Sequence, residues 1–276
     1  MQINKGARKL APVIWDVRSG ITVMSNKSIA KIIEAKKAVI FDLFHTLTSL
    51  ESTWDTGRPM TYEMLGVSRE AWDYQLQRKS RDRLVGLKKD AFEIVAEMAL
   101  SINPSITDER IKAATENRVK RFASALLEIP YETLSVLKCL KTEGKLIGLI
   151  SNADVMEVAA WHKSPIRHLF DSTIFSCMVG CVKPEKKIYE LSLSELEVQP
   201  GESVFVGDGG SNELEGAKNV GMTTIMITGF IMDLWPDRIA ERQRYADFII
   251  ERLSQLIVDE KVSSNKPAHP EVGACS

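Results

Sequence analysis

The stretch AVIFDLFHTLT, residues 38–48, is the starting point for predicting the fold of this 276-residue chain. Its first four residues, Ala38 to Phe41, are apolar and form a run typical of a buried strand, and the run ends at an acidic residue, Asp42. In open α/β sheets, ligands bind at the carboxyl ends of the strands, so a carboxylate in this position is a candidate functional group. An Asp can also cap a loop there, and this stretch alone leaves both interpretations open.

Five further apolar or β-branched runs follow, separated by longer segments with helical periodicity. They are Leu146–Ile150, Ser172–Phe175, Ser203–Val206, Thr223–Ile227 and, more weakly, Ala246–Ile249. Short apolar runs that alternate with helices are typical of βαβ units, whose parallel sheet is covered by helices on both faces. We therefore predict an α/β fold with a Rossmann-like parallel sheet flanked by helices.

An insertion of about 100 residues separates the first two runs, far more than a normal connection in such units, so it must carry its own structure. Three stretches in it repeat apolar residues at helical spacing after a helix start signal. These stretches are 68–86, 87–102 and 107–129. We predict a helical cap over residues 50–128 and a core formed by 37–49 and 129–260.

The two ends of the chain fall outside this plan. Residues 1–36 are predicted to form an N-terminal extension, with a short hairpin at 13–24 and a helix at 25–37 that leads into the first strand. The tail, 261–276, is polar and contains two prolines, so we expect it to be disordered.

Charge and composition argue against several function classes. The formal net charge of -1 and the pI near 6.5 provide no positive field to attract nucleic acid or an anionic membrane. The uncharged run Val220–Met232 is shorter than the roughly 20 residues that a membrane span requires. The N-terminal segment lacks the apolar stretch of a secretory signal, and the 4 cysteines show neither metal nor disulfide spacing. We expect a cytoplasmic protein that acts on a small molecule.

Polar residues recur where other predicted strands end. Ser151 and Asn152 follow the second run, where a hydroxyl can donate to a phosphoryl oxygen, although such a residue can also simply begin a helix. Asp208 and Glu213 flank a glycine-rich turn after the fourth run, and two carboxylates so placed can gather around one hard cation. Lys183 lies between two strands, just before a helix, and its ammonium can offset the charge of an anionic substrate.

These motifs, in their order and positions across residues 38–217, resemble those of the haloacid dehalogenase-like superfamily of hydrolases. The resemblance implies that Asp42 is a nucleophile, because a carboxylate can form an acyl-phosphate or ester intermediate that water then cleaves. The residues implied to be catalytic are Asp42, Thr46, Ser151, Asn152 and Lys183, and the last three are also implied to bind the substrate.

The resemblance also implies a cofactor, Mg²⁺, and a cap class. The implied metal ligands are Asp42, the backbone carbonyl of Phe44, Asp208 and Glu213, with Asn212 as a lesser candidate. Because the insertion follows the first motif directly, it resembles the first cap class of the family, found in haloacid dehalogenases and phosphoglycolate-type phosphatases.

Two positions depart from the family pattern. Phosphatases of the family usually carry a second Asp two positions after the nucleophile, where it protonates the leaving oxygen, but this chain has Phe44. An aromatic ring cannot transfer a proton, so acid catalysis worth about 10²- to 10⁴-fold is missing there. The next residue, His45, titrates near neutrality and is a candidate replacement for the acid; the alternative is a histidine packed under the cap or exposed at its hinge.

Several functions are compatible with this substitution. Our leading hypothesis is a Mg²⁺-dependent phosphohydrolase acting on a small phosphorylated metabolite, for which an acyl phosphate or anhydride would need no general acid. Haloacid dehalogenases carry an aromatic residue at the position of Phe44, but their fourth motif is less acidic than Asp208 and Glu213. Phosphonoacetaldehyde hydrolase uses a cap lysine as a Schiff base, and Lys88 and Lys89 lie in this cap, where a solvated charge pair is the simpler interpretation. A protein that keeps the fold only for binding is the remaining alternative.

Overall fold

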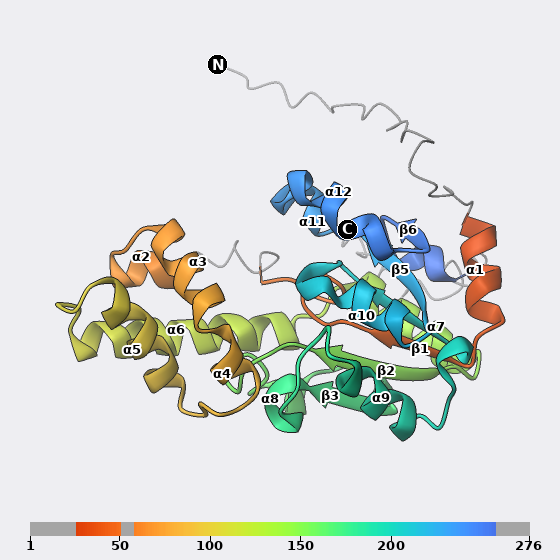
Figure 1. Ribbon diagram of the computed structural model, residues 1–276, viewed down its shortest axis with the longest axis horizontal. Helices are drawn as coiled ribbons and strands as arrows, with labels where there is room; N and C mark the ends of the chain where they lie inside the picture. The colour runs from red at the N-terminus through yellow and green to blue at the C-terminus, as the bar shows by residue number, and fades with distance from the viewer. Residues whose placement is uncertain (1–25, 51–57, 258–276) are drawn as a thin grey trace, which may run out of the picture.

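A six-stranded sheet forms the centre of the computed structural model, which describes residues 26–50 and 58–257 (Figure 1). The strands are β1 (Ala38–Phe41), β2 (Leu146–Ser151), β3 (Ser172–Phe175), β4 (Ser203–Gly207), β5 (Thr223–Ile227) and β6 (Phe248–Ile250). They are all parallel and lie in the order β3-β2-β1-β4-β5-β6. The predicted α/β class and parallel sheet are confirmed. The predicted hairpin at 13–24 and the tail 261–276 lie outside the described residues.

The sheet is covered on both faces, which explains why its strands are continuous apolar runs. In β1, Val39 and Phe41 pack into one apolar cluster, whereas Ala38 and Ile40 pack into another on the opposite face, since successive side chains of a strand alternate. The helices are α1 (Asn26–Glu34) and α7 (Tyr131–Thr142) on the first face, and α9 (Lys186–Glu195) and α10 (Glu213–Asn219) on the second. All four residues of β1 are buried, so the nucleophile candidate follows the most central part of the core.

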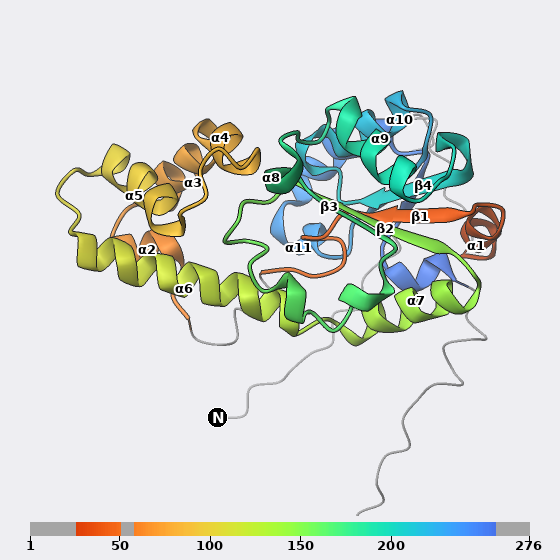
Figure 2. The same cartoon turned by 90° about the horizontal axis from the view of Figure 1, so that it is seen from below.

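The insertion between β1 and β2 is a lobe of helices beside the sheet (Figures 1 and 2). Its helices are α2 (Thr61–Leu65), α3 (Arg69–Arg78), α4 (Ser80–Leu84), α5 (Ala91–Ile102) and α6 (Asp108–Leu127). Side-chain oxygens of Ser68, Asp90 and Thr107 accept backbone N–H bonds at the starts of α3, α5 and α6, as their sequence signals predict. The lobe has its own apolar cluster, which includes Trp72 and Met98.

The structure corrects one helix in this insertion. Residues 68–86, predicted as one helical stretch, form α3 and α4, because the backbone leaves the helical conformation at Lys79 (φ −103°, ψ 20°). The break lets α4 present Arg83 to the core, where its guanidinium pairs with Asp154. The local spacing of apolar residues cannot predict such a distant contact. It also did not predict the short helix α2.

Short helical segments complete the chain. The α-helices are α8 (Ser176–Val179), α11 (Ile231–Leu234) and α12 (Ile239–Arg242), and the 3-10 turns are η3 (Trp161–Lys163), η4 (Arg167–Leu169), η5 (Pro200–Glu202), η6 (Gly210–Asn212), η7 (Pro236–Arg238), η8 (Gln243–Tyr245) and η9 (Leu253–Leu256). Helix α1 falls in the predicted N-terminal extension, yet Ile29 and Ile33 are buried in the core cluster that also contains η9 residues. None of the described helices has the length and apolarity needed to cross a membrane.

Candidate functional site

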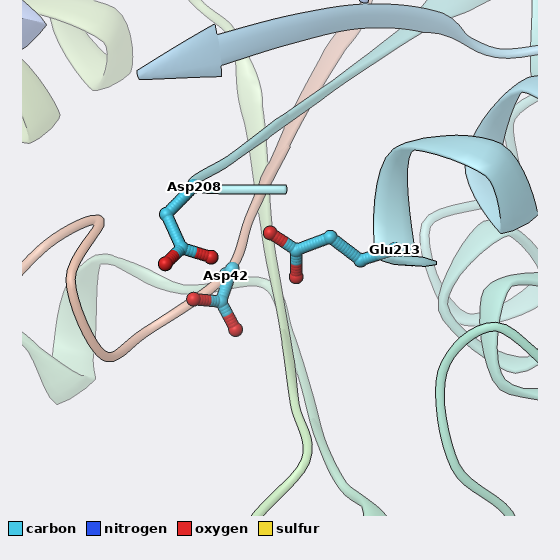
Figure 3. A group of neighbouring side chains, drawn as sticks. All are labelled: Asp42, Asp208 and Glu213. Carbon is cyan, nitrogen blue, oxygen red and sulfur yellow. The ribbon is translucent and has the colours of Figure 1, made fainter. Parts of the chain in front are cut away.

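Three carboxylates converge at the carboxyl edge of the sheet (Figure 3). Asp42 follows β1, Asp208 follows the neighbouring strand β4, and Glu213 begins α10. One oxygen from each lies within 4.8 Å of the others, and all three side chains are buried. Three hard oxygen donors at this spacing fit a divalent cation, so the cluster is suited to a metal site.

Lys183 lies against this cluster and neutralises part of its charge. Its Nζ donates to Oδ1 of Asp42 and, at 2.5 Å, to Oε2 of Glu213. Burial alone would lower the pKa of Lys183, but the two carboxylates outweigh it and hold that pKa above its usual range. The lysine is therefore a fixed positive charge beside the nucleophile candidate.

Burial also changes the pKa values of two of the carboxylates. Desolvation raises the pKa of Asp42, and Lys183 opposes that shift. Desolvation likewise raises the pKa of Glu213 well above its usual value, again against the effect of Lys183. A divalent cation would favour the ionised form of both side chains, which is a second reason why the cluster fits a metal.

The loop after β1 positions Asp42 through short contacts. Thr46 Oγ1 donates to Oδ2 of Asp42 at 3.2 Å, and His45 N donates to the carbonyl of Thr48 at 2.6 Å. His45 adopts a left-handed conformation (φ 62°), which non-glycine residues other than Asn, Asp and His seldom adopt. Thr48 Oγ1 in turn donates to the carbonyl of Ala125 in α6 at 2.7 Å. The loop after β1 is thus tied to α6 of the helical insertion.

The turn between β4 and α10 orients the other two carboxylates. Gly210 N donates to Asp208 Oδ1 at 2.8 Å, and Gly209 N donates to Glu213 Oε1 at 2.9 Å. At Gly207, a Cβ would lie 2.2 Å from Oε1 of Glu213, so a side chain there would displace that carboxylate. Asn212, the lesser metal candidate, is exposed in this turn.

Asn152 binds the backbone of Lys183 in both directions. Its Nδ2 donates to the Lys183 carbonyl at 3.0 Å, and its Oδ1 accepts from the Lys183 N–H at 2.8 Å. Ser151, the last residue of β2, is buried beside it in the chain. The amide of Asn152 therefore holds the segment that delivers the lysine, a contact that the motif comparison did not predict.

Arg242 is a site residue that the sequence analysis missed. From α12 its Nη1 pairs with Oδ2 of Asp208, and its guanidinium carbon lies 5.1 Å from the ring centroid of Trp235. The ring of Trp235 also packs edge-on against His45 at 4.8 Å. Arg242 is 34 residues from Asp208 in a polar segment with no motif, so only the fold brings the two together.

Phe44 and His45 occupy distinct surroundings. The ring of Phe44 packs edge-on against Phe122 of α6, with 5.4 Å between centroids, and Arg118 lies 4.7 Å from the Phe122 ring. Phe44 thus joins the nucleophile loop to the cap through aromatic contact. His45 is half-buried, and its ring packs against Trp235, which follows α11.

Ion pairs also connect the cap to the core. Arg83 Nη1 lies 2.9 Å from Oδ2 of Asp154, and Arg118 Nη2 lies 2.8 Å from Oε1 of Glu157. Burial and the nearby Glu157 raise the pKa of Asp154 to about 6, although both arginines act in the opposite direction. In contrast, Lys88, the candidate Schiff-base lysine, forms an ion pair with Glu97 within the cap.

Comparison with known proteins places the chain in a family. The haloacid dehalogenase-like hydrolase family matches residues 36–221. A glyceraldehyde 3-phosphate phosphatase of Pyrococcus furiosus is 31% identical over 149 residues, which cover 52% of this chain and 60% of that protein. A protein of the same name from Methanocaldococcus jannaschii is 26% identical over 230 residues, covering 80% of this chain and 95% of that protein.

A solved dehalogenase structure resembles the fold. It superimposes with a TM-score of 0.58 at 21% identity, over 80% of this chain and 96% of that one. The chain spans about 60% of the length of the first relatives that it matches. The chain belongs to the haloacid dehalogenase-like hydrolases. Its helical insertion follows β1, where the first cap class of the family carries its cap.

Proposed function

We propose that this chain is a Mg²⁺-dependent phosphohydrolase that acts on a small phosphorylated metabolite through a covalent intermediate on Asp42. The observation that supports the proposal best is the buried group of three carboxylates with Lys183 between two of them. A metal-free attack on carbon would need no such cluster. When bound, Mg²⁺ would neutralise charge on the transferring phosphoryl oxygens, held by Asp42, Asp208, Glu213 and the Phe44 carbonyl.

In the first half of the proposed reaction, a carboxylate oxygen of Asp42 forms a bond to phosphorus. The bond from phosphorus to the leaving oxygen breaks, and that oxygen departs with the electron pair. Lys183 already contacts Oδ1 of Asp42, so its charge also faces an anionic phosphoryl group bound there. Thr46 holds the other oxygen at 3.2 Å and restricts rotation of the carboxylate. The proposed substrate contacts on this side are the hydroxyl of Ser151, the last residue of β2, and the second Nδ2 hydrogen of Asn152, which follows β2.

In the second half, water attacks phosphorus, inorganic phosphate leaves, and the carboxylate of Asp42 is regenerated. The leaving oxygen of the first half needs a proton, and Phe44 cannot supply it. We assign this role to His45, whose half-buried ring lies three residues from the nucleophile in a loop that both share. For a substrate with a good leaving group, such as an acyl phosphate, no proton is needed.

The cap, which we place at residues 50–128, is the proposed selector of substrate. The two archaeal relatives are named for a phosphorylated three-carbon aldehyde, so a compact phosphate ester or acyl phosphate is the substrate class to examine first. Phe44 and Phe122 give the cap side of the site an apolar surface. Such a surface favours a small organic group over a highly charged one.

The proposal is tested with the purified full chain, assayed on alkyl phosphates, aryl phosphates and acyl phosphates with Mg²⁺ and with a chelator. We expect turnover of at least one phosphate class that the chelator removes and Mg²⁺ restores. Asp42→Asn should abolish it, whereas Asp108→Asn, an exposed carboxylate at the start of α6, should leave it unchanged. Chelator-resistant turnover, or full activity of Asp42→Asn, would refute the mechanism.

A second candidate function is hydrolysis of a 2-haloacid, favoured by the aromatic residue at position 44. There Asp42 would attack carbon, halide would leave, and water would attack the carboxyl carbon of the resulting ester. Single turnover in ¹⁸O-labelled water separates the two reactions. Attack of water on phosphorus places the label in phosphate and none in Asp42, but ester hydrolysis places it in the Asp42 carboxylate. We expect labelled phosphate.

A further inference from the structure

A cavity of about 620 Å³ lies at the β3 edge of the sheet, and none of the site residues lines it. Its walls come from β3, the residue Met178 of α8, and the segment from Val155 through η3 and η4 to Phe170. Small-molecule sites in proteins have volumes of about 300 to 1,000 Å³, so the cavity is large enough for a ligand.

The inner wall of this cavity is apolar and rigid. Trp161 packs edge-on against Phe170 and Phe175, with 5.6 Å between centroids in each case. Val155 and Val158 complete the wall, and Met178, which is 71% exposed, lies at the opening. An aliphatic chain would lose contact with water against this surface, which is favourable in proportion to the area covered.

The rim of the cavity carries positive or protonatable groups. Arg167, His162 and His168 all line it and are exposed, and no Asp or Glu is among the lining residues. Arg167 makes no ion pair within the described ranges, so its guanidinium is available to a ligand. Guanidinium groups bind carboxylates with two parallel hydrogen bonds, which makes this rim complementary to an anionic head group.

We propose that this cavity is a second ligand site, separate from the hydrolase centre, that binds a small amphipathic carboxylate. The aliphatic chain lies against Trp161 and the two valines, and the carboxylate faces Arg167. Val155 directly follows Asp154, and Val158 directly follows Glu157. These two acidic residues bind the cap arginines. A bound ligand would therefore contact the same segment that anchors the cap.

Calorimetric titration of the full chain with octanoate tests the proposal. We expect one site per chain, with a Kd of about 0.1 to 1 mM for a ligand of this size. The neutral analogue 1-octanol should bind at least about tenfold more weakly, since it lacks the charge that Arg167 recognises.

Two variants at exposed residues locate the site. Arg167→Gln removes the cation, and Met178→Glu adds a repelling charge at the opening; each should weaken octanoate binding by about tenfold or more. Lys163→Gln is the matched control, because Lys163 is an exposed cation of the same segment that does not line the cavity. It should change the Kd by less than about twofold.

The outcomes are distinct from those of the proposed phosphatase. Octanoate binding should be unchanged by saturating Mg²⁺ and inorganic phosphate and by Asp42→Asn, because it does not involve the hydrolase centre. Lack of saturable octanoate binding, or equal affinity for octanoate and octanol, would overturn the proposal. It would also be overturned if Arg167→Gln and Met178→Glu bound octanoate as tightly as the wild type does, or if phosphate abolished binding.

Discussion

Phe44 is the residue that most affects the chemistry of this site. It stands where phosphatases of the family carry an acid, and its ring instead packs against Phe122 of the cap at 5.4 Å. In the proposed mechanism, Thr46 orients Asp42 and Lys183 offsets its charge, and neither role depends on the side chain at position 44. The side chain at position 44 therefore does not supply the proton transfer, which we assign to His45, and single substitutions can examine both residues.

Asp at position 44 should supply that transfer in a chain that lacks the His45 imidazole. In the His45→Asn background, we expect Phe44→Asp to raise turnover of alkyl phosphates by about 10²-fold, since a positioned general acid contributes about 10²- to 10⁴-fold. Loss of the contact with Phe122 should lower the free energy of unfolding by about 1 to 3 kcal/mol. Phe44→Asn is the control of matched size, and equal turnover by the Asp and Asn variants would contradict the prediction.

His45 is examined best by a substitution that keeps its backbone. Because its φ is 62°, Asn is the suitable replacement: it tolerates this conformation but does not titrate near neutrality. We expect His45→Asn to slow hydrolysis of alkyl phosphates by about 10²-fold and to leave acyl phosphates within about twofold. The measurement is the dependence of turnover on the pKa of the leaving group. An equal loss for all substrates would exclude His45 as the acid.

At the scale of elements, the site depends on a contact between two segments that follow neighbouring strands. Asn152, directly after β2, makes two hydrogen bonds to the backbone of Lys183, which lies in the segment between α8 and α9. The side chain of Lys183 then reaches both Asp42 and Glu213. An amide at the end of one strand thus places a charge at the end of another.

Asn152→Ala should misplace Lys183 without removing it. We expect kcat to fall by about tenfold to 100-fold and the free energy of unfolding to fall by about 1 to 3 kcal/mol, for two lost hydrogen bonds. Asn152→Asp keeps an acceptor for the Lys183 N–H and should recover part of the stability. Asn219→Ala, at an exposed asparagine that ends α10, is the control. Unchanged kcat in Asn152→Ala would show that this contact does not position the lysine.

At the scale of the whole molecule, cap and core meet through buried ions as well as through aromatic rings. Arg83 and Arg118 come from two cap helices, and Asp154 and Glu157 come from the core segment after β2. The Nε atoms of both arginines are buried without hydrogen-bond partners, which adds to the desolvation cost of the cluster. Buried ions of this kind make the docking of the cap sensitive to protonation.

The pKa of Asp154 leads to a prediction about stability. It is about 6 in the folded chain against an ordinary value of 3.8, so the folded state binds this proton more tightly. The associated stability is complete below pH 3.8 and is lost as pH rises through about 6. From about pH 4.5 to about pH 7.5, the wild type should therefore lose about 2 kcal/mol relative to Asp154→Asn.

Urea unfolding of both chains across this pH range checks the prediction. Asp108→Asn, at an exposed carboxylate, is the control and should follow the wild type at every pH. Parallel profiles of wild type and Asp154→Asn would contradict the prediction, because they would mean that Asp154 binds its proton equally in both states.

The amino-acid sequence alone was enough to predict the sheet, the position of the inserted helices and the residues that follow β1, β2 and β4. These features are local: a buried strand needs a continuous apolar run, and a helix needs a repeat of three to four residues with a start signal, so each is carried by neighbours in the chain. The run before Asp42 and the turn around Asp208 are examples. The break at Lys79 was not predicted, because it accompanies the contact of Arg83 with Asp154, which lies far away in the sequence.

The contacts among these residues depend on the tertiary fold. Lys183 lies 141 residues from Asp42, and their contact depends on the sheet order and on the two hydrogen bonds from Asn152. Arg242 reaches Asp208 from a segment without a motif, and the cavity at the β3 edge is lined by residues from several elements. Such contacts join positions far apart in the chain, so their distances and charges are set by packing rather than by local spacing.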